Sequence, residues 1–422
     1  MIATLRSAFN AAFRASEYQQ LLTQLNKFSG TRIEFRVSET PIFLPKYLLD
    51  QMAQAGAALT KRLLAWPEYL AGARASIPAG YRVAAETAHP NFLTADFALV
   101  QDALGELTPR LVEIQAFPSV FAYQELLTST YREVFHLPSS LGIFLNGLDR
   151  EGFWRLLRET ILGKHDPKHV VLTEVDPYHQ KTLPDFLLTA RRLGIEIVDI
   201  ATIEPRGNKL HYRDSAGKLI PIHRIYNRAI VDEIIARQIH LPFDLTQPWE
   251  VEWAGHPNWY FLISKYSVPW LTASETPESS VVPPAAFLDD FLAGPGRDRL
   301  VAAGVSLPDT DTASAVYDSL LLKPLFSFAG KGIQFAPSRL ELESIPDAER
   351  SNYLLQQRMH FVPTIETPQG LTQAEIRILY VWPDGGTLTP LLPLVRLGRG
   401  KMMGVDHNRD FEWVGASAAF WQ

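Results

Sequence analysis

The segment from Leu322 to Ile333 reads "LKPLFSFAGKGI", a strand-like apolar run that contains Lys323 and leads into a loop of small residues around Lys331. The backbone N–H groups of such a loop can fold over phosphates. The spacing is not that of a phosphate loop, because Lys331 is followed by glycine and no glycine lies five residues before Gly330. Taken alone, the segment fits either a glycine hairpin or a phosphate-binding loop.

Two later segments add polar groups at strand spacing. In "EIRILYVW", Glu375 and Arg377 are two residues apart and therefore share one face of the expected strand. Buried charges at such positions need a ligand or a partner. The segment "YLLQQRM" contains Gln356 and Gln357 and predicts a strand whose backbone groups can meet the edge of an adenine ring.

The first part of the chain predicts helices followed by a hairpin. The first seventy residues are mainly amphipathic at helical spacing, "TLRSAFNAAFRASEYQQLLTQL" and "PKYLLDQMAQAGAALTKRLLAW", with one strand-like piece, "RIEFRV". Between Pro90 and Phe117, two β-type runs flank "QDALGELTP", whose Gly and Pro favour a turn. We expect a hairpin there and a helix in the following "FAYQELLTSTYREVF".

The middle of the chain alternates between strand and helix patterns. After Lys168, the segments "HVVLTEV", "LPDFLLTARRLG" and "IEIVDI" predict strand, helix and strand, and "KLHY" and "IPIHRIYNR" precede a helix in "AIVDEIIARQIH". This order predicts a parallel sheet with a crossover helix, a layered α/β domain. After a surface connection in "LTASETPESSVVPPAAF", four strand-like runs, "DSLLLKPLF", "NYLLQQRM", "EIRILYVW" and "LLPLVRLG", predict an antiparallel sheet.

Composition narrows the class of protein. The 422 residues are 46% hydrophobic, enough for two or three packed domains, and the formal net charge of -6 argues against bulk affinity for nucleic acid. The absence of cysteine excludes disulfides and thiolate chemistry and favours a cytoplasmic protein. The N-terminus lacks the pattern of a secretory signal, and no apolar run is long enough to cross a bilayer, so we expect no membrane partner.

The order of these segments from about Pro90 to the C-terminus resembles the ATP-grasp enzymes, and among them the circularly permuted group related to glutathionylspermidine synthase. "KPLFSFAGKGI" is similar to the family pattern "KP…GGKGV", and "NWYFLISKYSVPWL" is similar to the segment with a second nucleotide-binding lysine, here Lys265. The resemblance implies that ATP and Mg²⁺ are the cofactors. The expected nucleotide-binding residues are Lys265, Lys323, Ser327, Ala329, Gly330, Lys331, Gly332, Gln356 and Gln357.

The family's early acidic segment resembles "ADFALVQDALGELTPRLVEIQAF", which implies that Asp96, Glu113 and Gln115 are the metal ligands. Glu113 and Gln115 alternate along a strand, so both can point at one ion. We count Asp96, Glu113 and Arg377 as catalytic candidates. Without the family context, an edge strand with a solvated polar face is the favoured interpretation of "LVEIQAF".

The resemblance also implies a fold of α/β type with α+β lobes, an ATP-grasp with a Rossmann-like domain before it. "VVLTEVDPYHQKTLPDFLLTARRLGIEIVDI" resembles that Rossmann-like domain, and "IHRIYNRAIVDEI" resembles the family's "D-x-I-Y-R-R" segment. We expect N-terminal helices and the acidic hairpin in residues 1–150, the Rossmann-like domain in residues 151–255, and the ATP-grasp lobes in residues 256–422.

Two positions depart from the family pattern, and one segment offers a rival metal site. Thr94 stands where arginine is usual, and Gln115 stands where asparagine is usual. The rival is "GVDHNRDFEW", which fits a surface turn or a loop near the acceptor site as well as a metal site; its acidic and amide residues are Asp406, Asn408, Asp410 and Glu412. Arg396 and Arg399 in "VRLGRGKMMG" can face an acyl phosphate or remain solvated loop cations.

Three functions follow as hypotheses. The first is an ATP-dependent ligase that joins a small-molecule carboxylate to an amine through an acyl phosphate and releases ADP. The second is a nucleotide-binding protein without turnover, which the departures at Thr94 and Gln115 would allow. The third is a small-molecule kinase, whose product is a stable phosphorylated compound. The sequence leaves the two substrates and the oligomeric state open.

Overall fold

The largest sheet of the protein brings an early hairpin beside late strands. In the computed structural model, which describes residues 1–102, 104–273, 277–308, 312, 314–326, 332–400, 403, 408 and 410–422, the strand order of this sheet is β1-β18-β17-β16-β2-β3, with β15 paired to β16. Its strands are β1 (Ile42–Leu44), β2 (Phe92–Gln101), β3 (Leu107–Gln115), β15 (Ile365–Thr367), β16 (Gly370–Val381), β17 (Thr389–Gly398) and β18 (Gly415–Trp421). The predicted hairpin is confirmed as β2 and β3, which pair antiparallel.

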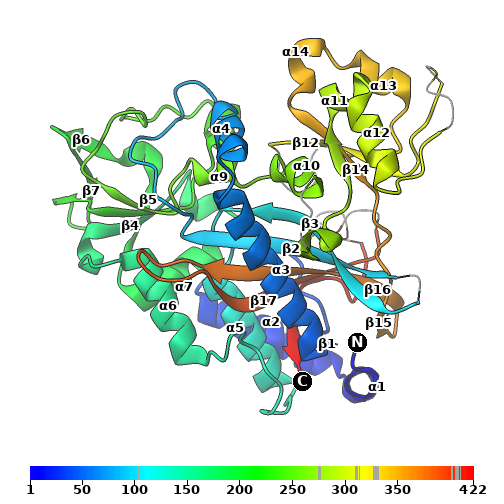
Figure 1. Ribbon diagram of the computed structural model, residues 1–422. Coiled ribbons are helices and arrows are strands. Elements are labelled where there is room, and N and C mark those ends of the chain that lie inside the picture. Colours follow the sequence, from blue (N-terminus) through cyan, green and yellow to red (C-terminus); the bar gives the residue numbers. More distant parts are fainter. Residues whose placement is uncertain are drawn as a thin grey trace.

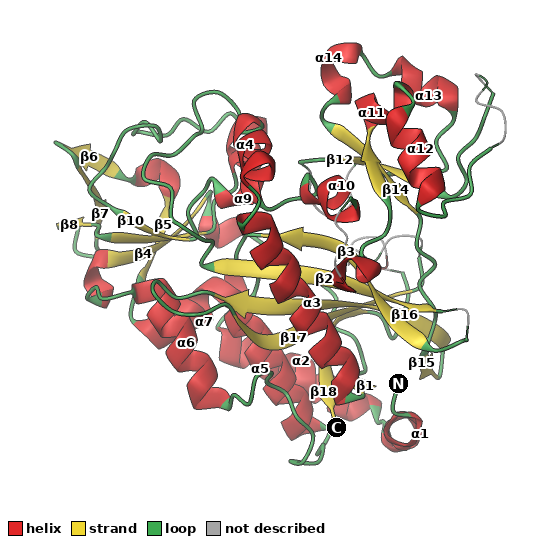
Figure 2. Ribbon diagram, in the orientation of Figure 1, coloured by secondary structure: helices red, strands yellow, loops and turns green. Residues whose placement is uncertain are grey.

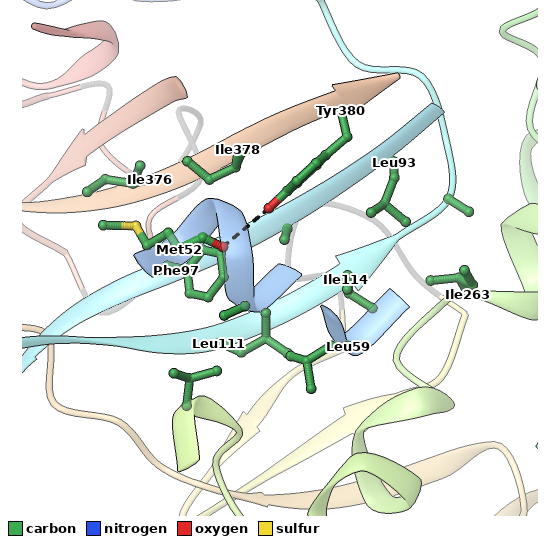
Figure 3. Packing of buried hydrophobic residues seen from close by; sticks show 14 of the residues in the cluster. Met52, Leu59, Leu93, Phe97, Leu111, Ile114, Ile263, Ile376, Ile378 and Tyr380 are labelled. Atoms are coloured by element: carbon green, nitrogen blue, oxygen red, sulfur yellow. Dashed lines mark hydrogen bonds between the residues drawn. The ribbon is translucent and has the colours of Figure 1, made fainter. Parts of the chain in front are cut away.

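Helix α3 (Lys46–Leu64) covers one face of this sheet. Figure 3 shows Met52 and Leu59 of the helix facing Phe97 and Ile114 of the hairpin. The Tyr380 hydroxyl on β16 donates to the backbone oxygens of Met52 and Ala53, at 3.3 and 3.0 Å. Burial of these alternating apolar side chains fixes the register of β2, because a shift by one residue would turn them away from the helix.

A parallel sheet with the order β10-β9-β4-β5 forms a second unit beside the large sheet (Figure 2). Its strands are β4 (Val170–Glu174), β5 (Glu196–Asp199), β9 (Arg224–Asn227) and β10 (Glu252–Ala254). Helix α7 (Leu183–Leu193) connects β4 to the parallel strand β5, which confirms the predicted strand-helix-strand unit. Between β5 and β9 the chain forms a small antiparallel sheet of β6 (Glu204–Arg206), β7 (Lys209–Arg213) and β8 (Leu219–Pro221).

A third unit stands apart from the large sheet at the upper edge of Figure 1. Its sheet has the order β11-β14-β12-β13, and four short helices cover it. The strands are β11 (Ala285–Phe287), β12 (Leu320–Pro324), β13 (Gln334–Phe335) and β14 (Tyr353–Gln357), and the helices are α11 (Leu288–Leu292), α12 (Pro295–Ala302), α13 (Arg339–Ser344) and α14 (Asp347–Arg350). We refer to this unit as the small lobe.

The four late strand-like runs do not form one antiparallel sheet as expected. Strands β12 and β14 pair in the small lobe, whereas β16 and β17 pair in the large sheet. The physical reason is that β16 buries its apolar face under α3 and pairs with β2, while β12 and β14 bury theirs under the small lobe's own helices. The described parts of these runs are therefore divided between the two sides of a cleft.

The remaining helices pack around these sheets. They are α1 (Ala3–Ala12), α2 (Ala15–Ser29), α4 (Pro67–Ala75), α5 (Phe121–Val134), α6 (Arg150–Leu162), α8 (Val231–Ala236), α9 (Trp259–Leu262) and α10 (Ser267–Thr272). The predicted helix at residues 229–240 is shorter than expected and ends at Ala236, because Gln238 adopts a left-handed backbone with φ 51°. Among the helices described, none has the length and apolar character required to span a membrane.

The strand predicted in residues 32–37 is wrong. The segment lies beside α2, bends at Phe35 and makes an isolated bridge between Val37 and Ala416. Phe35 packs edge-on against Tyr123 of α5, with ring centroids 5.2 Å apart. Contacts with helices therefore hold the segment, where a strand would be held by ladder hydrogen bonds.

Candidate functional site

Strands β2, β16 and β17 carry a buried network of alternating charges. Asp96 and Arg377 are cross-strand partners, and so are Glu375 and Arg396. Both Asp96 oxygens accept hydrogen bonds from Arg377, each at 2.6 Å, and one also accepts from Arg396 at 2.6 Å. Arg396 lies 2.6 Å from Glu375 as well. Opposite charges placed directly across a sheet stabilise each other.

Burial and charge shift the two carboxyl groups in opposite directions. Burial alone would raise the pKa of Asp96, but the charges of Arg377 and Arg396 outweigh it, so that the pKa lies below its ordinary value. Burial raises the pKa of Glu375 to about 7, with Arg396 opposing the rise and Asp96 adding to it. Near neutral pH, Asp96 is therefore the anion that fixes the two arginines, while Glu375 is close to its midpoint.

Two buried lysines and Glu113 complete the charged part of the site. Lys265, in the turn between α9 and α10, places its Nζ 3.7 Å from Glu113 Oε2, and Arg377 lies 3.9 Å from the other Glu113 oxygen. Lys323 extends from β12 of the small lobe and is also buried. Burial lowers the pKa of Lys323 to about 8; Glu113 and Glu375 oppose the change, and Lys265 adds to it.

These side chains line one cavity of about 560 Å³ between the large sheet and the small lobe, which we call the cleft. Its basic residues are Lys181, Arg228, Lys265, Lys323, Arg377 and Arg396, and its acidic residues are Glu113, Glu174, Glu233 and Glu375. The structure thus brings together the predicted residues Glu113, Gln115, Lys265, Lys323 and Arg377, with Asp96 buried behind them. A cluster of buried cations that faces a cavity is suited to bind an anion.

The far end of the cleft lies at the carboxyl ends of β4 and β9. In sequence, β5 follows β4 on one side of it, and β9 lies on its other side, so the strand order reverses between β4 and β9. Ligands commonly bind at such a point in open α/β sheets. Glu174 ends β4, and Arg228 follows β9 with its Nη1 3.8 Å from Asp185 of α7. Burial raises the pKa of Glu174 to about 8 and that of Asp185 to about 6.

Glu174, Arg228 and Lys181 line the cleft but were not predicted from the sequence. A signal was present, because Glu174 lies near the end of the predicted strand "HVVLTEV" and Arg228 ends the segment "IPIHRIYNR". Three buried polar atoms near this end of the cleft have no hydrogen-bond partner among the residues that the structure describes, namely Thr173 Oγ1, Asp185 Oδ2 and Arg228 Nε. Of these three residues Arg228 lines the cleft, and an unsatisfied buried polar atom there supports a ligand.

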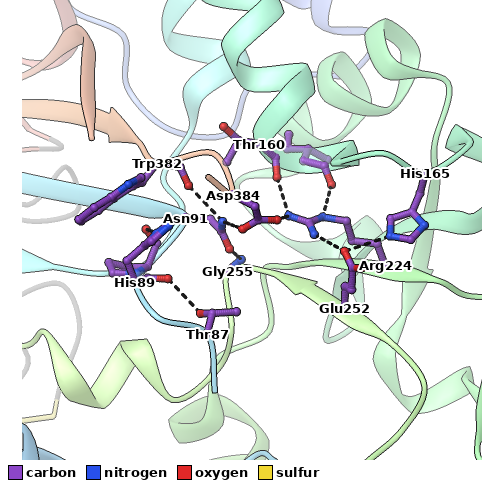
Figure 4. Close-up of polar contacts among 12 residues, drawn as sticks. Thr87, His89, Asn91, Thr160, His165, Arg224, Glu252, Gly255, Trp382 and Asp384 are labelled. Carbon is purple, nitrogen blue, oxygen red and sulfur yellow. Dashed lines mark hydrogen bonds and ion pairs between the residues drawn. The ribbon is translucent and has the colours of Figure 1, made fainter. Parts of the chain in front are cut away.

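A second polar network holds the parallel sheet against the large sheet (Figure 4). Arg224, buried at the start of β9, binds Glu252 at 2.7 Å and Asp384 at 2.8 Å. Asp384 lies in the turn between β16 and β17 and accepts from Asn91, next to β2, at 2.9 Å. His165 lies 3.0 Å from the shared Glu252 oxygen. This network fixes the relative position of the two sheets that line the cleft.

A smaller cavity of about 300 Å³ adjoins the cleft and shares Lys323 and Glu375 with it. It lies between the small lobe and the large sheet and is lined by apolar side chains such as Leu321 and Phe335. Gln356 is the cross-strand partner of Leu321, and neither polar atom of its buried amide has a hydrogen-bond partner among the described residues. An amide with two unmet hydrogen bonds is a candidate contact for a nucleobase. Gln357 uses its backbone N–H to reach Pro284 at 2.8 Å.

The glycine loop is described only at its end. Gly332 has a left-handed backbone, φ 78°, and a Cβ there would meet Pro324, so this position requires glycine. The other predicted loop residues, Ser327, Ala329, Gly330 and Lys331, lie outside the described residues.

In the described part of the rival segment at residues 404–413, Asn408 and Glu412 accept hydrogen bonds from other parts of the protein. Asn408 Oδ1 accepts from the backbone N–H groups of Arg399 and Gly400, at 2.9 and 3.1 Å. Glu412 accepts from Gln369 at 3.0 Å, and Asp406 lies outside the described residues. The Arg399 side chain donates to Thr372 and Thr367 and lines the smaller cavity, whereas Arg396 lines the cleft.

Glu113 and Gln115 of β3 offer one carboxylate and one amide oxygen as metal donors. Mg²⁺ binds one or two carboxylates and completes its shell with water and phosphate oxygens. Glu113 and Gln115 both line the cleft, and the contacts of Glu113 with its cations are long. The oxygens of Asp96 are occupied by arginine, so Asp96 can join such a site only by giving up a contact. Within the described ranges, no group of three or more acidic or histidine side chains is placed to hold a metal.

Comparisons with known proteins add little to this description. No protein-family model matches the chain, and no curated protein matches it in sequence. Among solved structures, a glutathione synthetase-like effector (GSS30) from Globodera pallida, in its apo form, is similar over 96% of this chain and 97% of its own, with 12% identity and a TM-score of 0.47. A similarity at this level does not assign the chain to a family.

Proposed function

We propose that the protein is an ATP-dependent ligase that joins a carboxylate to an amine through an acyl phosphate and releases ADP. The observation that carries this proposal is the convergence of Lys323, from the small lobe, with Lys265 and Arg377 around one cavity. Phosphoryl transfer needs its phosphates held in line and their charge neutralised, and it needs little else from the protein. Cations supplied from two separate units suit that task.

The resemblance of the chain to the permuted ATP-grasp group gives each part a role. ATP, when bound, supplies the phosphoryl group, and Mg²⁺ neutralises its charge. In this proposal Lys323 and Lys265 hold phosphates, Gln356 meets the base in the smaller cavity, and Glu113 with Gln115 holds the metal. The Asp96 carboxylate positions Arg377 and Arg396 so that both face the reacting group.

The two ends of the cleft suit two different reactants. The phosphate end is lined by the lysines and arginines of the large sheet and the small lobe. The other end, at Glu174 and Arg228, carries both signs of charge, and burial raises the pKa of its Glu174 carboxyl group to about 8. We infer that the carboxylate is activated at the first end and that the small-molecule amine enters from the second.

We also propose the division into N-terminal helices and acidic hairpin (1–150), Rossmann-like domain (151–255) and ATP-grasp lobes (256–422). The pairing of β2 with β16 supports a permuted ATP-grasp, because it places the early acidic residues in the same sheet as the late charged strand. The parallel sheet with its crossover helix supports the Rossmann-like assignment.

The test is equilibrium binding of Mg-ATP to Lys323→Ala. A charge-assisted contact contributes about 1.5 to 3 kcal/mol, so affinity should fall roughly tenfold or more. Lys218→Ala, at an exposed turn position, is the matched control and should bind as the unaltered protein does. ADP release with pooled amino acids and polyamines then tests turnover, and a stable phosphorylated product in place of an amide would identify a kinase.

One observation favours a second candidate, a nucleotide-binding protein without turnover. Asp96 is bonded to two arginines, which removes one of the three predicted metal ligands from the donor set. Thr94 and Gln115 also differ from the residues usual in the resembling family. Tight Mg-ATP binding with no ADP release for any acceptor would establish this candidate over the ligase.

A further inference from the structure

The far end of the cleft places a buried basic residue next to a buried acidic one. Asn227 of β9 is paired with Thr173 of β4, and the Arg228 backbone N–H donates to the Thr173 backbone oxygen at 2.8 Å. Glu174, which follows Thr173, and Arg228 both line the cleft. Their exposed fractions are only 5% and 4%. The ends of two neighbouring strands thus bring opposite charges to one end of the cavity.

The Arg228 guanidinium group has hydrogen-bonding capacity that the described residues do not use. Its Nη1 donates to the backbone oxygen of Ser119 and lies 3.8 Å from Asp185 Oδ2, which is longer than a hydrogen bond. Its Nε has no hydrogen-bond partner among the residues that the structure describes. The ring centroids of Phe117 and Phe186 lie 5.8 and 5.2 Å from its Cζ. A buried arginine with an unused N–H group is suited to bind a carboxylate.

Glu174 offers a carboxyl group to a cation at the same end. Its Oε1 accepts from the Val175 backbone N–H at 2.8 Å, and within the described part of the chain it forms no ion pair, with Arg228 or any other residue. Burial raises the pKa of Glu174 to about 8, and the charge of Arg228 opposes this rise. The carboxyl group is therefore mostly protonated at neutral pH, and an ammonium group placed beside it would favour its ionised form.

The remaining charges at this end of the cleft are balanced. Asp185 offsets the charge of Arg228. Glu233 lies 2.8 Å from Arg237, and Lys181 also has a partner. The empty site is therefore close to neutral. It favours a ligand that brings one charge of each sign over a ligand that brings positive charges alone.

We propose that the far end of the cleft binds an amino acid, with its carboxylate on Arg228 and its ammonium group on Glu174. The role of this molecule rests on the proposed ligase function, in which it is the amine substrate. The inference specifies that substrate as an amine that carries its own carboxylate. A polyamine is disfavoured, because it offers no carboxylate to Arg228 and adds positive charge that the described residues of this end do not offset.

The test compares amino acids with the amines that lack only their carboxyl group. The pairs are alanine with ethylamine, serine with ethanolamine, histidine with histamine, ornithine with putrescine and lysine with cadaverine. Each compound is titrated calorimetrically into the protein at neutral pH without nucleotide. In at least one pair the amino acid should bind about tenfold tighter than its amine, as expected for one charge-assisted contact.

Two variants separate the two contacts. Arg228→Gln should bring the members of each pair within about twofold of each other, because the carboxylate loses its charged partner. Combining it with Asp185→Asn gives the same comparison if the single variant does not fold, since no unpaired carboxylate is then left behind. Glu174→Gln should weaken the amino acid and its amine alike and leave their ratio unchanged. Arg158→Ala, at an exposed position of α6, is the matched control and should retain the full preference.

The proposal is overturned if no amino acid binds tighter than its amine, or if Arg228→Gln keeps the preference. The titrations contain no nucleotide, so their result is separate from Mg-ATP binding by Lys323→Ala. A preference that depends on Arg228, in a protein that releases no ADP, would retain the ligand class and reject the ligase. Amide formation with polyamines, in a protein without the preference, would retain the ligase and reject this inference.

Discussion

The protonation state of Lys323 should affect how strongly the cleft binds Mg-ATP. Burial lowers its pKa to about 8, so the side chain is charged below that pH and loses its proton as the pH rises through it. A neutral amine holds phosphate less strongly than an ammonium group does. We therefore expect the contribution of Lys323 to Mg-ATP affinity to be lost as the pH rises through about 8.

Calorimetric titrations from pH 6.5 to 10 check this expectation. Lys323→Arg should remove the decline, because arginine keeps its proton throughout this range. Affinity that stays level to pH 10 in the unaltered protein would mean that Lys323 does not contact the nucleotide.

Glu113 and Gln115 differ in what their substitution should do. Glu113→Gln keeps the size of the side chain and removes the charge that the metal requires, so we expect an intact fold and no metal-dependent turnover. Gln115→Asn restores the residue usual in the resembling family and should preserve or raise turnover. Thermal unfolding and ADP release at several Mg²⁺ concentrations measure both, and full activity in Glu113→Gln would remove it from the metal site.

At the scale of elements, the sequence predicts individual strands and helices better than it predicts which strands pair. The hairpin of β2 and β3, helix α5 and the unit β4-α7-β5 follow from patterns within a few residues. The separation of β12 and β14 from β16 and β17 into two sheets could not be predicted in this way, because no local pattern indicates which strands share a sheet. The arginine partners of Asp96 were missed for the same reason, since they lie 281 and 300 residues away.

The contact between α3 and β16 gives a prediction at this scale. A Cβ at Gly56 would collide with the Tyr380 hydroxyl and crowd the Cβ of Ala95. Alanine normally stabilises a helix interior by about 1 kcal/mol relative to glycine, but overpacking here costs about 1 to 3 kcal/mol. We expect Gly56→Ala to lower the free energy of unfolding, as measured by urea denaturation.

Tyr380→Phe removes the hydroxyl and should recover part of that loss when combined with Gly56→Ala. A single Gly56→Ala variant that is more stable than the unaltered protein would show that α3 approaches β16 less closely than described.

At the scale of the whole molecule, the cleft is formed by three units. The large sheet combines strands from both ends of the chain, and the other two units lie between them in sequence. The large sheet contributes the acidic hairpin and two arginines, the small lobe contributes Lys323, and the parallel sheet contributes the far end with Glu174 and Arg228. The network around Arg224 fixes the parallel sheet to the large sheet (Figure 4). Strand patterns in the sequence indicate Lys323, Glu375 and Arg377, and the family resemblance adds Lys265 and Glu113. The far end of the cleft follows from the strand order of the parallel sheet.

The most direct test of the central claim is a crystal structure of the protein with Mg²⁺ and a non-hydrolysable ATP analogue. We expect phosphate oxygens within hydrogen-bonding distance, about 3 Å, of Lys323 and Lys265. We also expect the adenine ring in the smaller cavity beside Gln356, and a metal ion bound by Glu113. A Glu113 carboxylate further than about two water diameters from every phosphate and ion, where not even a bridging water reaches, would contradict the proposed site.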